Sequence, residues 1–263
     1  MRFTKMHGLG NDYLYVYGQV PPNATALSIF LSERHFGAGS DGMIYISPSD
    51  TADFRMRIFN ADGSEAMMCG NGIRCVGKYV YEKGYTDKTN LTIETRAGQK
   101  TLELHVEDGK VRKVTVDMGQ AMIEPEKHLD ANRALVLCTP VSVGNPHAVL
   151  FVEDAEKAPV TTLGPLLEVH PAFPGGVNVE FVQVLSNTSL RMRVWERGSG
   201  VTMACGTGAC ASVAAATEKG YCRYDTPVAV HLDGGVLTVQ VSSDGRISMT
   251  GPAELVYEGE VFL

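Results

Sequence analysis

An internal duplication is the feature of this sequence that most restricts how the chain can fold. Residues 55–85 align without a gap to residues 191–221, and 11 of the 31 positions are identical. The offset is 136 positions throughout and relates Cys69 to Cys205, each of which is followed by Gly-x-Gly. A unit that occurs twice in 263 residues indicates two similar domains, because a solenoid needs at least about three repeats. If each half presents its cysteine to one substrate, that substrate meets a sulfur atom on each face.

The composition is that of a globular protein, with 44% apolar and 20% charged residues. A formal net charge of −7 argues against binding to nucleic acid or to an anionic membrane surface. No apolar run approaches the length of about 18 residues that indicates a membrane span. Residues 1–10 lack the apolar core of a secretory signal. We therefore expect a cytoplasmic protein whose cysteines are thiols.

The pattern along the chain is rich in strands and contains a few helices. Short β-like runs at residues 54–59 and 190–195 precede the two cysteines. Helices are predicted at about residues 73–83 and 209–219, each ended by a glycine as C-terminal cap. The second helix is made of small, nearly uncharged residues, which suits a helix enclosed by a sheet.

The duplication continues beyond these helices. Asp108-Gly109 and Asp244-Gly245 are hairpin turns at the same offset of 136 positions. We predict a first domain of residues 1–118 and a second of residues 119–252, with residues 120–130 as the crossover. Residues 253–263 are expected to return and pack on the first domain.

A cysteine placed before Gly-x-Gly at the start of a helix has a defined chemistry. Glycines allow a ligand close to the backbone, and the first helical N–H groups are unpaired donors. The positive end of the helix dipole stabilises an anion and lowers the pKa of a nearby thiol. A thiol adjusted in this way can act as general base or general acid.

Two such thiols suggest a reaction that removes a proton from one face of a carbon and returns one to the other face, which is racemisation or epimerisation. The carboxylate beside the reacting carbon would be held by residues that follow the cysteines, namely Gly70, Asn71, Gly206 and Thr207. Such a mechanism needs neither a metal ion nor pyridoxal phosphate.

The six cysteines allow other interpretations. Four of them are expected to be small apolar core residues: Cys75, Cys138, Cys210 and Cys222. Zinc binding by Cys69 with Cys75, or by Cys205 with Cys210, is disfavoured because the C-x2-C spacing is absent. We therefore predict no metal site.

Residues 37–42 match the dinucleotide pattern G-x-G-x-x-G but in the wrong context. A helix-like run at residues 25–35 precedes them, and a strand-like run at residues 43–47 follows. A dinucleotide-binding loop has the strand first and the helix second. The match is therefore interpreted as accidental.

Several motifs together resemble the diaminopimelate epimerase family, cofactor-independent enzymes of lysine and cell-wall precursor synthesis. The matching segments are residues 5–13, 60–65, 68–75, 144–147, 177–181, 196–198 and 204–209. The sequence departs from the family pattern at Tyr13, where Phe is usual, and at Gly42, where some members carry Gln. The second departure affects one substrate contact.

The resemblance implies an α/β (α+β) fold of two pseudo-symmetric domains. Each domain is expected to be a mixed, β-barrel-like sheet around a central helix, with the active site in the cleft between them. The family also implies a homodimer whose small-molecule substrate is diaminopimelate, with no cofactor and no nucleic-acid partner. The implied reaction interconverts LL- and meso-diaminopimelate.

The resemblance also assigns roles to individual residues. Cys69 and Cys205 correspond to the two acid/base thiols, with Cys69 facing the hydrogen of the L centre. His147 and Glu196 are expected to tune the thiols or to bind the reacting ammonium group. Substrate contacts are implied for Asn11, Asn60, Gly70, Asn71, Asn145, Asn178, Glu196, Arg197, Gly206 and Thr207. The distal zwitterion of the substrate needs an arginine for its carboxylate and acceptors for its ammonium group.

Two alternative functions stay open at this point. A related racemase could act on proline, hydroxyproline or histidine, and would not depend on Arg197. A non-catalytic protein could use the glycine-rich segments to bind an amino acid, and would not exchange the α-hydrogen with solvent. Taken alone, Asn11 and Asn60 would be ordinary turn residues, and His147 would be a buried core histidine. Their assignment therefore depends on the surrounding motifs.

Overall fold

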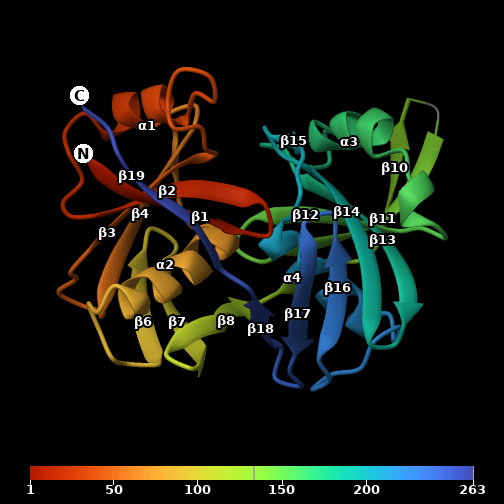
Figure 1. The fold of residues 1–263 in the computed structure, drawn as a ribbon. Coiled ribbons are helices and arrows are strands. Elements are labelled where there is room, and N and C mark those ends of the chain that lie inside the picture. Colours follow the sequence, from red (N-terminus) through yellow and green to blue (C-terminus); the bar gives the residue numbers. More distant parts are fainter. Residues whose placement is uncertain (133, 263) are drawn as a thin grey trace. The chain divides into compact units, whose positions relative to one another are not determined.

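The computed structural model describes residues 1–132 and 134–262, with four α-helices and mixed β-sheet among them. The chain divides into two compact units, the first formed by residues 1–116 and 251–263 and the second by residues 117–250. The ribbon is coloured along the chain in Figure 1. Within the described residues, none of the helices has the length and apolar character needed to cross a bilayer.

The first unit contains the helices α1 and α2 and the strands before and after them. Its elements are β1 (Arg2–Gly8), β2 (Asn11–Tyr17), α1 (Ala24–Ser32), β3 (Gly42–Ser47), β4 (Phe54–Asn60), β5 (Glu65–Ala66), α2 (Gly70–Glu82), β6 (Asn90–Thr95), β7 (Gly98–Glu107), β8 (Lys110–Gln120) and β19 (Glu254–Glu260). The last strand, β19, pairs antiparallel with β1.

The second unit repeats this order of elements. It contains β9 (Met122–Ile123), β10 (Lys127–Ala131), β11 (Ala134–Ser142), β12 (Pro146–Phe151), the 3-10 turn η1 (Ala155–Lys157), α3 (Val160–Glu168), β13 (Asn178–Ser186), β14 (Ser189–Glu196), β15 (Gly200–Val201), α4 (Gly206–Glu218), β16 (Val228–Leu232), β17 (Gly235–Val241) and β18 (Arg246–Gly251). The segment interpreted as a crossover, residues 120–130, includes β9 and most of β10.

The strand pairings of the two units follow one scheme. In the first unit β1 is antiparallel to β2, β2 parallel to β3, β3 antiparallel to β4, β4 parallel to β6, and β6, β7 and β8 are antiparallel. In the second unit β11, β12, β13, β14, β16, β17 and β18 pair with the same alternation. The duplicated sequence therefore corresponds to a duplicated mixed α/β fold, as predicted.

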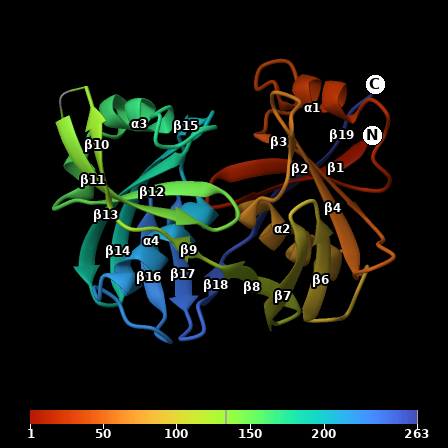
Figure 2. The same cartoon turned by 180° about the vertical axis from the view of Figure 1, so that it is seen from behind.

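The helices α2 and α4 are enclosed by strands of their own units. In α2 every residue from Gly70 to Val80 is buried, and the helix packs against β1, β2 and β7. Helix α4 packs against β11 to β14, β16 and β17, and both ribbon views show it among those strands (Figure 2). The small side chains of α4 allow this close approach.

Both helices begin three residues before the predicted start, directly after the cysteine. Cys69 and Cys205 are the N-cap residues of α2 and α4, and both have extended backbone angles. Glycine has a low intrinsic helix propensity, so propensity alone places the start after the Gly-x-Gly segment. The predicted ends are confirmed by Gly84 and Gly220, which have φ of 75° and 74° in the left-handed region.

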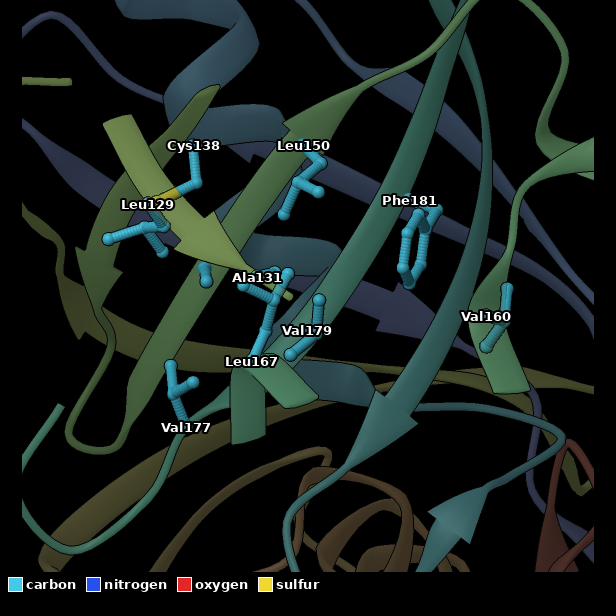
Figure 3. Packing of buried hydrophobic residues seen from close by; sticks show 10 residues of the cluster. Leu129, Ala131, Cys138, Leu150, Val160, Leu167, Val177, Val179 and Phe181 are labelled. Carbon is cyan, nitrogen blue, oxygen red and sulfur yellow. The ribbon is translucent and has the colours of Figure 1, made fainter. Parts of the chain in front are cut away.

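In each unit a second helix packs on the face of the sheet that points away from the enclosed helix. This helix is α1 in the first unit and α3 in the second. In the second unit, Val179 and Phe181 of β13 belong to a buried apolar cluster with Leu167 of α3 (Figure 3). Because successive side chains of a strand point to opposite faces, Glu180 faces the α4 side. In the first unit α1 packs in the same way against Met43 and Tyr45 of β3.

Helix α1 precedes the G-x-G-x-x-G segment and β3 follows it. This order confirms that the segment is not a dinucleotide-binding loop.

Candidate active site

In the first unit, Cys69 caps helix α2 with its side chain. The Gly72 N–H donates to the Cys69 sulfur at 3.3 Å, and the Cys69 thiol donates to Asn11 Oδ1 at 3.4 Å. Asn11 Nδ2 in turn donates to Asp41 Oδ2 at 2.9 Å. The sulfur is partly exposed, and it lies at the helix end that carries a partial positive charge.

A buried arginine holds the start of α2 in place. Arg74 has no exposed surface, and its Nη2 donates to Asn71 Oδ1 at 2.9 Å while Nη1 donates to the Gly70 carbonyl at 3.1 Å. Its Nε donates to the carbonyl of Pro252 at 3.1 Å. Arg74 therefore fixes both residues that follow Cys69.

The remaining predicted residue of the first unit, Asn60, ends strand β4. Its Nδ2 donates to Ser64 Oγ at 3.1 Å, and the Tyr13 hydroxyl donates to its Oδ1 at 3.5 Å. Gly42 pairs with Asn60 across the strands, and a Cβ atom at Gly42 would lie 2.2 Å from the Phe59 carbonyl oxygen. The backbone at this position therefore has no room for a glutamine side chain.

In the second unit, Cys205 caps helix α4 with the same geometry. The Gly208 N–H donates to the Cys205 sulfur at 3.3 Å, and Thr207 Oγ1 lies 3.6 Å from that sulfur. Cys205 is only 4% exposed. Burial, followed by the negative charges of Glu196 and Glu180, raises the pKa of this thiol well above its ordinary value.

Glu196 lies beside the second cysteine at the end of β14. It accepts hydrogen bonds from the Thr202 hydroxyl and from the Cys205 thiol. Burial and the charge of Glu180 raise the pKa of Glu196 above its ordinary value, although the two hydrogen bonds act in the opposite direction. The second thiol and a partly buried carboxyl group thus share one environment.

His147 is fully enclosed in this environment and is linked to two partners. Its Nδ1 lies 2.6 Å from Glu180 Oε1, and its Nε2 lies 3.1 Å from Asn145 Oδ1. Asn145 Nδ2 donates to Thr207 Oγ1 at 3.3 Å. Five polar residues, of which the sequence assigned four, therefore surround Cys205: Asn145, His147, Glu180, Glu196 and Thr207.

Asn178 and Arg197 form a second group in the same unit. Asn178 Oδ1 accepts a hydrogen bond from the Arg197 backbone N–H at 3.0 Å, and Asn178 Nδ2 donates to the Pro146 carbonyl at 3.1 Å. The guanidinium of Arg197 donates to the Gly175 carbonyl at 3.0 Å. Pro146 precedes His147, so this group adjoins the network around Cys205.

A protein-family match covers most of both units of this chain. The model of the family described as diaminopimelate epimerase matches residues 3–124 and 139–256. The chain belongs to the diaminopimelate epimerase family. This membership confirms the resemblance drawn from the motifs.

Relatives in this family are similar over their full length. Diaminopimelate epimerase of Methanococcus maripaludis strain C6 is 51% identical, with 99% of each chain covered. The diaminopimelate epimerase of Bacteroides thetaiotaomicron is 52% identical, covering 99% of this chain and 98% of its own. That of Acetivibrio thermocellus is 48% identical, covering 100% and 99%.

Solved structures of lower sequence identity share the fold. A phenazine biosynthesis protein of the PhzF family from Bacillus anthracis has a TM-score of 0.79 at 18% identity and covers 100% of this chain and 99% of its own. A probable proline racemase from Agrobacterium radiobacter has a TM-score of 0.76 at 19% identity, covering 100% and 93%. At these identities the likeness concerns the fold alone.

Two residues of the site were not predicted from the sequence, although both lie inside matched motifs. Arg74 lies in the first cysteine motif, residues 68–75, and Glu180 lies in the motif of residues 177–181. The duplication contained a signal for the second, because Glu180 aligns with Ile44 at an offset of 136 positions. A charged residue at an apolar position of the repeat indicates a task specific to one half.

Proposed function

We propose that this protein is a cofactor-independent isomerase that interconverts LL- and meso-diaminopimelate in the synthesis of lysine and peptidoglycan precursors. Family membership and relatives about half identical over the full chain support the substrate. The observation that carries the mechanism is the pair of equivalent caps, with Gly72 N–H and Gly208 N–H each 3.3 Å from a cysteine sulfur.

In the first step of the LL-to-meso direction, the Cys69 thiolate removes the α-hydrogen of the L centre as a proton. The electron pair of the broken C–H bond passes into the adjacent carboxylate. Backbone N–H groups at Gly70, Asn71, Gly206 and Thr207 stabilise the charge that develops there. No metal ion or pyridoxal phosphate is needed for this step.

In the second step, the Cys205 thiol donates its proton to the opposite face of the same carbon. A new C–H bond forms, and Cys205 is left as the thiolate while Cys69 carries the proton taken from the substrate. The meso-to-LL direction uses the two sulfurs in exchanged roles. This step requires that Cys205 be protonated before the reaction begins.

Six residues are proposed to contact the substrate, most of them at its distal amino-acid group: Asn11, Asn60, Asn145, Asn178, Glu196 and Arg197. Arginine matches a carboxylate, and amide oxygens with a carboxylate accept from an ammonium group. This second head distinguishes diaminopimelate from proline or hydroxyproline, which have none.

Incubation of the protein with LL-diaminopimelate in heavy water tests the function. We expect meso-diaminopimelate carrying deuterium at the inverted α-carbon, followed by NMR, because each inversion delivers a solvent-derived proton. Parallel tubes contain proline and hydroxyproline. Exchange with these but not with diaminopimelate would identify a different racemase, and exchange with none would indicate a binding protein.

We further propose that the protein works as a homodimer in the cytoplasm. The family resemblance supports this proposal. Light scattering coupled to gel filtration measures the mass of the particle against 28.4 kDa for one chain.

A further inference from the structure

Glu180 is a buried carboxylate for which packing offers no reason. Its side chain has 0% exposure, and Oε1 lies 2.6 Å from His147 Nδ1. Oε2 is also buried, and among the described residues it has no hydrogen-bond partner. Burying an ionised carboxylate with one oxygen unpaired is costly, so a purely structural position would favour an apolar side chain.

The first unit shows that an apolar side chain does fit this position. A Cβ atom at Gly208 would lie 2.7 Å from Glu180 Oε1, and a Cβ atom at Gly72 would lie 2.7 Å from Ile44 Cδ1. Ile44 and Glu180 thus lie against the same residue of the two caps. The repeated fold accommodates isoleucine at this position in the first unit. Packing therefore does not require glutamate at the same position in the second unit.

From Glu180 a continuous chain of polar contacts leads to the second cysteine. His147 Nε2 lies 3.1 Å from Asn145 Oδ1, and Asn145 Nδ2 lies 3.3 Å from Thr207 Oγ1. Thr207 Oγ1 lies 3.6 Å from the Cys205 sulfur. Each member is fixed by its neighbour, and Glu180 is the buried end that fixes His147.

We propose that Glu180 is a positioning residue for Cys205, which orients the His147–Asn145–Thr207 chain and whose charge keeps Cys205 in the thiol form between turnovers. This inference rests on the proposed function, because the donor of the second step must start with its proton. Glu180 does not contact substrate in this scheme and transfers no proton itself.

The charges around Cys205 agree with this role. The titratable groups that face Glu180 are His147 on β12, Glu196 on β14 and Cys205 at the start of α4. Burial raises the pKa of the Cys205 thiol most, and the carboxylates of Glu196 and Glu180 raise it further. A negative charge nearby favours the uncharged thiol over the thiolate.

The variant Glu180→Gln separates charge from shape, because glutamine keeps the size and an oxygen for His147. For the LL-to-meso direction we expect kcat to fall about 10- to 100-fold, by analogy with partners that orient metal-bound histidines, with KM within about twofold. Removal of one negative charge lowers the pKa of Cys205. The high-pH limb of the rate profile, where the donor thiol is lost, should therefore move to lower pH.

A second readout does not depend on catalysis. Iodoacetamide reacts with the thiolate, so the pH dependence of Cys205 alkylation, measured by peptide mass spectrometry, reports its protonation. We expect the alkylation midpoint of Glu180→Gln to lie below that of the native protein. Glu153→Gln removes an exposed carboxylate from the same unit and should leave both profiles unchanged.

The outcomes are distinguishable. A Glu180→Gln protein with native kcat, native pH profile and native alkylation profile would overturn the inference. If the native protein fails to epimerise diaminopimelate, the proposed function is wrong, while the alkylation data still decide the effect of Glu180 on Cys205.

Two further measurements guard against a variant that does not fold. Glu180→Asp keeps the charge but shortens the reach to His147, so it should retain the native high-pH limb while kcat falls. In the native protein itself, Cys205 should alkylate with a midpoint above about 8.5, the value of an ordinary thiol. A midpoint at or below that value contradicts the inference.

Discussion

The segments around Cys69 and Cys205 have the same backbone geometry but differ in the side chains that pack against them. Both sulfurs accept a glycine N–H at 3.3 Å at the start of a buried helix. Strand pairing relates Leu14 to Met43 in the first unit and Ala148 to Val179 in the second. The offset is therefore 134 positions for β2 and β12 but 136 for β3 and β13, so the loop containing α3 is two residues longer than the loop containing α1.

With these offsets, three positions that differ in side-chain chemistry can be compared directly. Tyr13, Ile44 and Asn60 of the first unit correspond to His147, Glu180 and Glu196 of the second. The duplicated caps have kept the same position of the sulfur at a helix N-terminus. In the second unit the carboxylates of Glu196 and Glu180 favour the thiol form of Cys205. In a two-base reaction, one sulfur must begin without its proton and the other with it.

The largest expected effect comes from replacing either sulfur. Cys69→Ser and Cys205→Ser should each lower kcat by several orders of magnitude, because general acid–base catalysis contributes about 10²- to 10⁴-fold and a serine hydroxyl is far less acidic than a thiol. Steady-state rates in both directions measure this. Cys138→Ala, a buried cysteine outside both caps, is the matched control and should keep its turnover.

Each serine variant lacks the thiol on one face of the carbon. Near-native turnover in either variant would therefore contradict the assignment of Cys69 and Cys205 as the acid and base.

The halves also differ in the residue after the β4 and β14 strands, where Ala61 aligns with Arg197. If Arg197 binds the distal carboxylate, Arg197→Met should raise KM for diaminopimelate about 100-fold, because a charge-assisted hydrogen bond contributes about 1.5–3 kcal/mol. The effect on kcat should be smaller. Arg223→Met, an exposed arginine of the same unit, is the control. An unchanged KM would remove Arg197 from the substrate site.

A smaller effect sharpens the comparison of Ile44 with Glu180. In Gly208→Ala the new methyl group meets the carboxylate that holds His147, so kcat should fall about 10-fold. In Gly72→Ala it meets the terminal methyl of Ile44, which can rotate away. That variant should lose about 1–3 kcal/mol of unfolding free energy through overpacking and keep most of its kcat.

Rates and thermal unfolding of the two alanine variants, measured side by side, decide between these outcomes. A larger loss of kcat in Gly72→Ala than in Gly208→Ala would contradict the assignment of the charged network to the second half.

The features that were predictable from the sequence are those set by residues close together in the chain. Glycines at 84 and 220 end their helices because the left-handed cap conformation suits glycine, and the Asp-Gly pairs mark hairpins. The cysteine caps were located by their repeated context. The helix starts were placed too late because a cap bond to Cys69 or Cys205 outweighs the low propensity of glycine.

The role of Glu180 was not predictable, because it depends on contacts between distant strands. A gap-free alignment at 136 positions pairs His147 with Asn11, whereas the strand pairing relates His147 to Tyr13. The contact of Glu180 with His147 requires the parallel pairing of β12 and β13, for which the sequence carries no local signal. The roles of the other substrate-contact residues stay predictions.

The alternation along β13 lets one short strand meet two requirements. Val179 and Phe181 fill the apolar cluster under α3, and the carboxylate between them serves the cysteine on the other side. Inserting or deleting a single residue in this strand would exchange the contents of its two faces, because side chains repeat every second position. The register of this strand is therefore what keeps the carboxylate on the side of the cysteine.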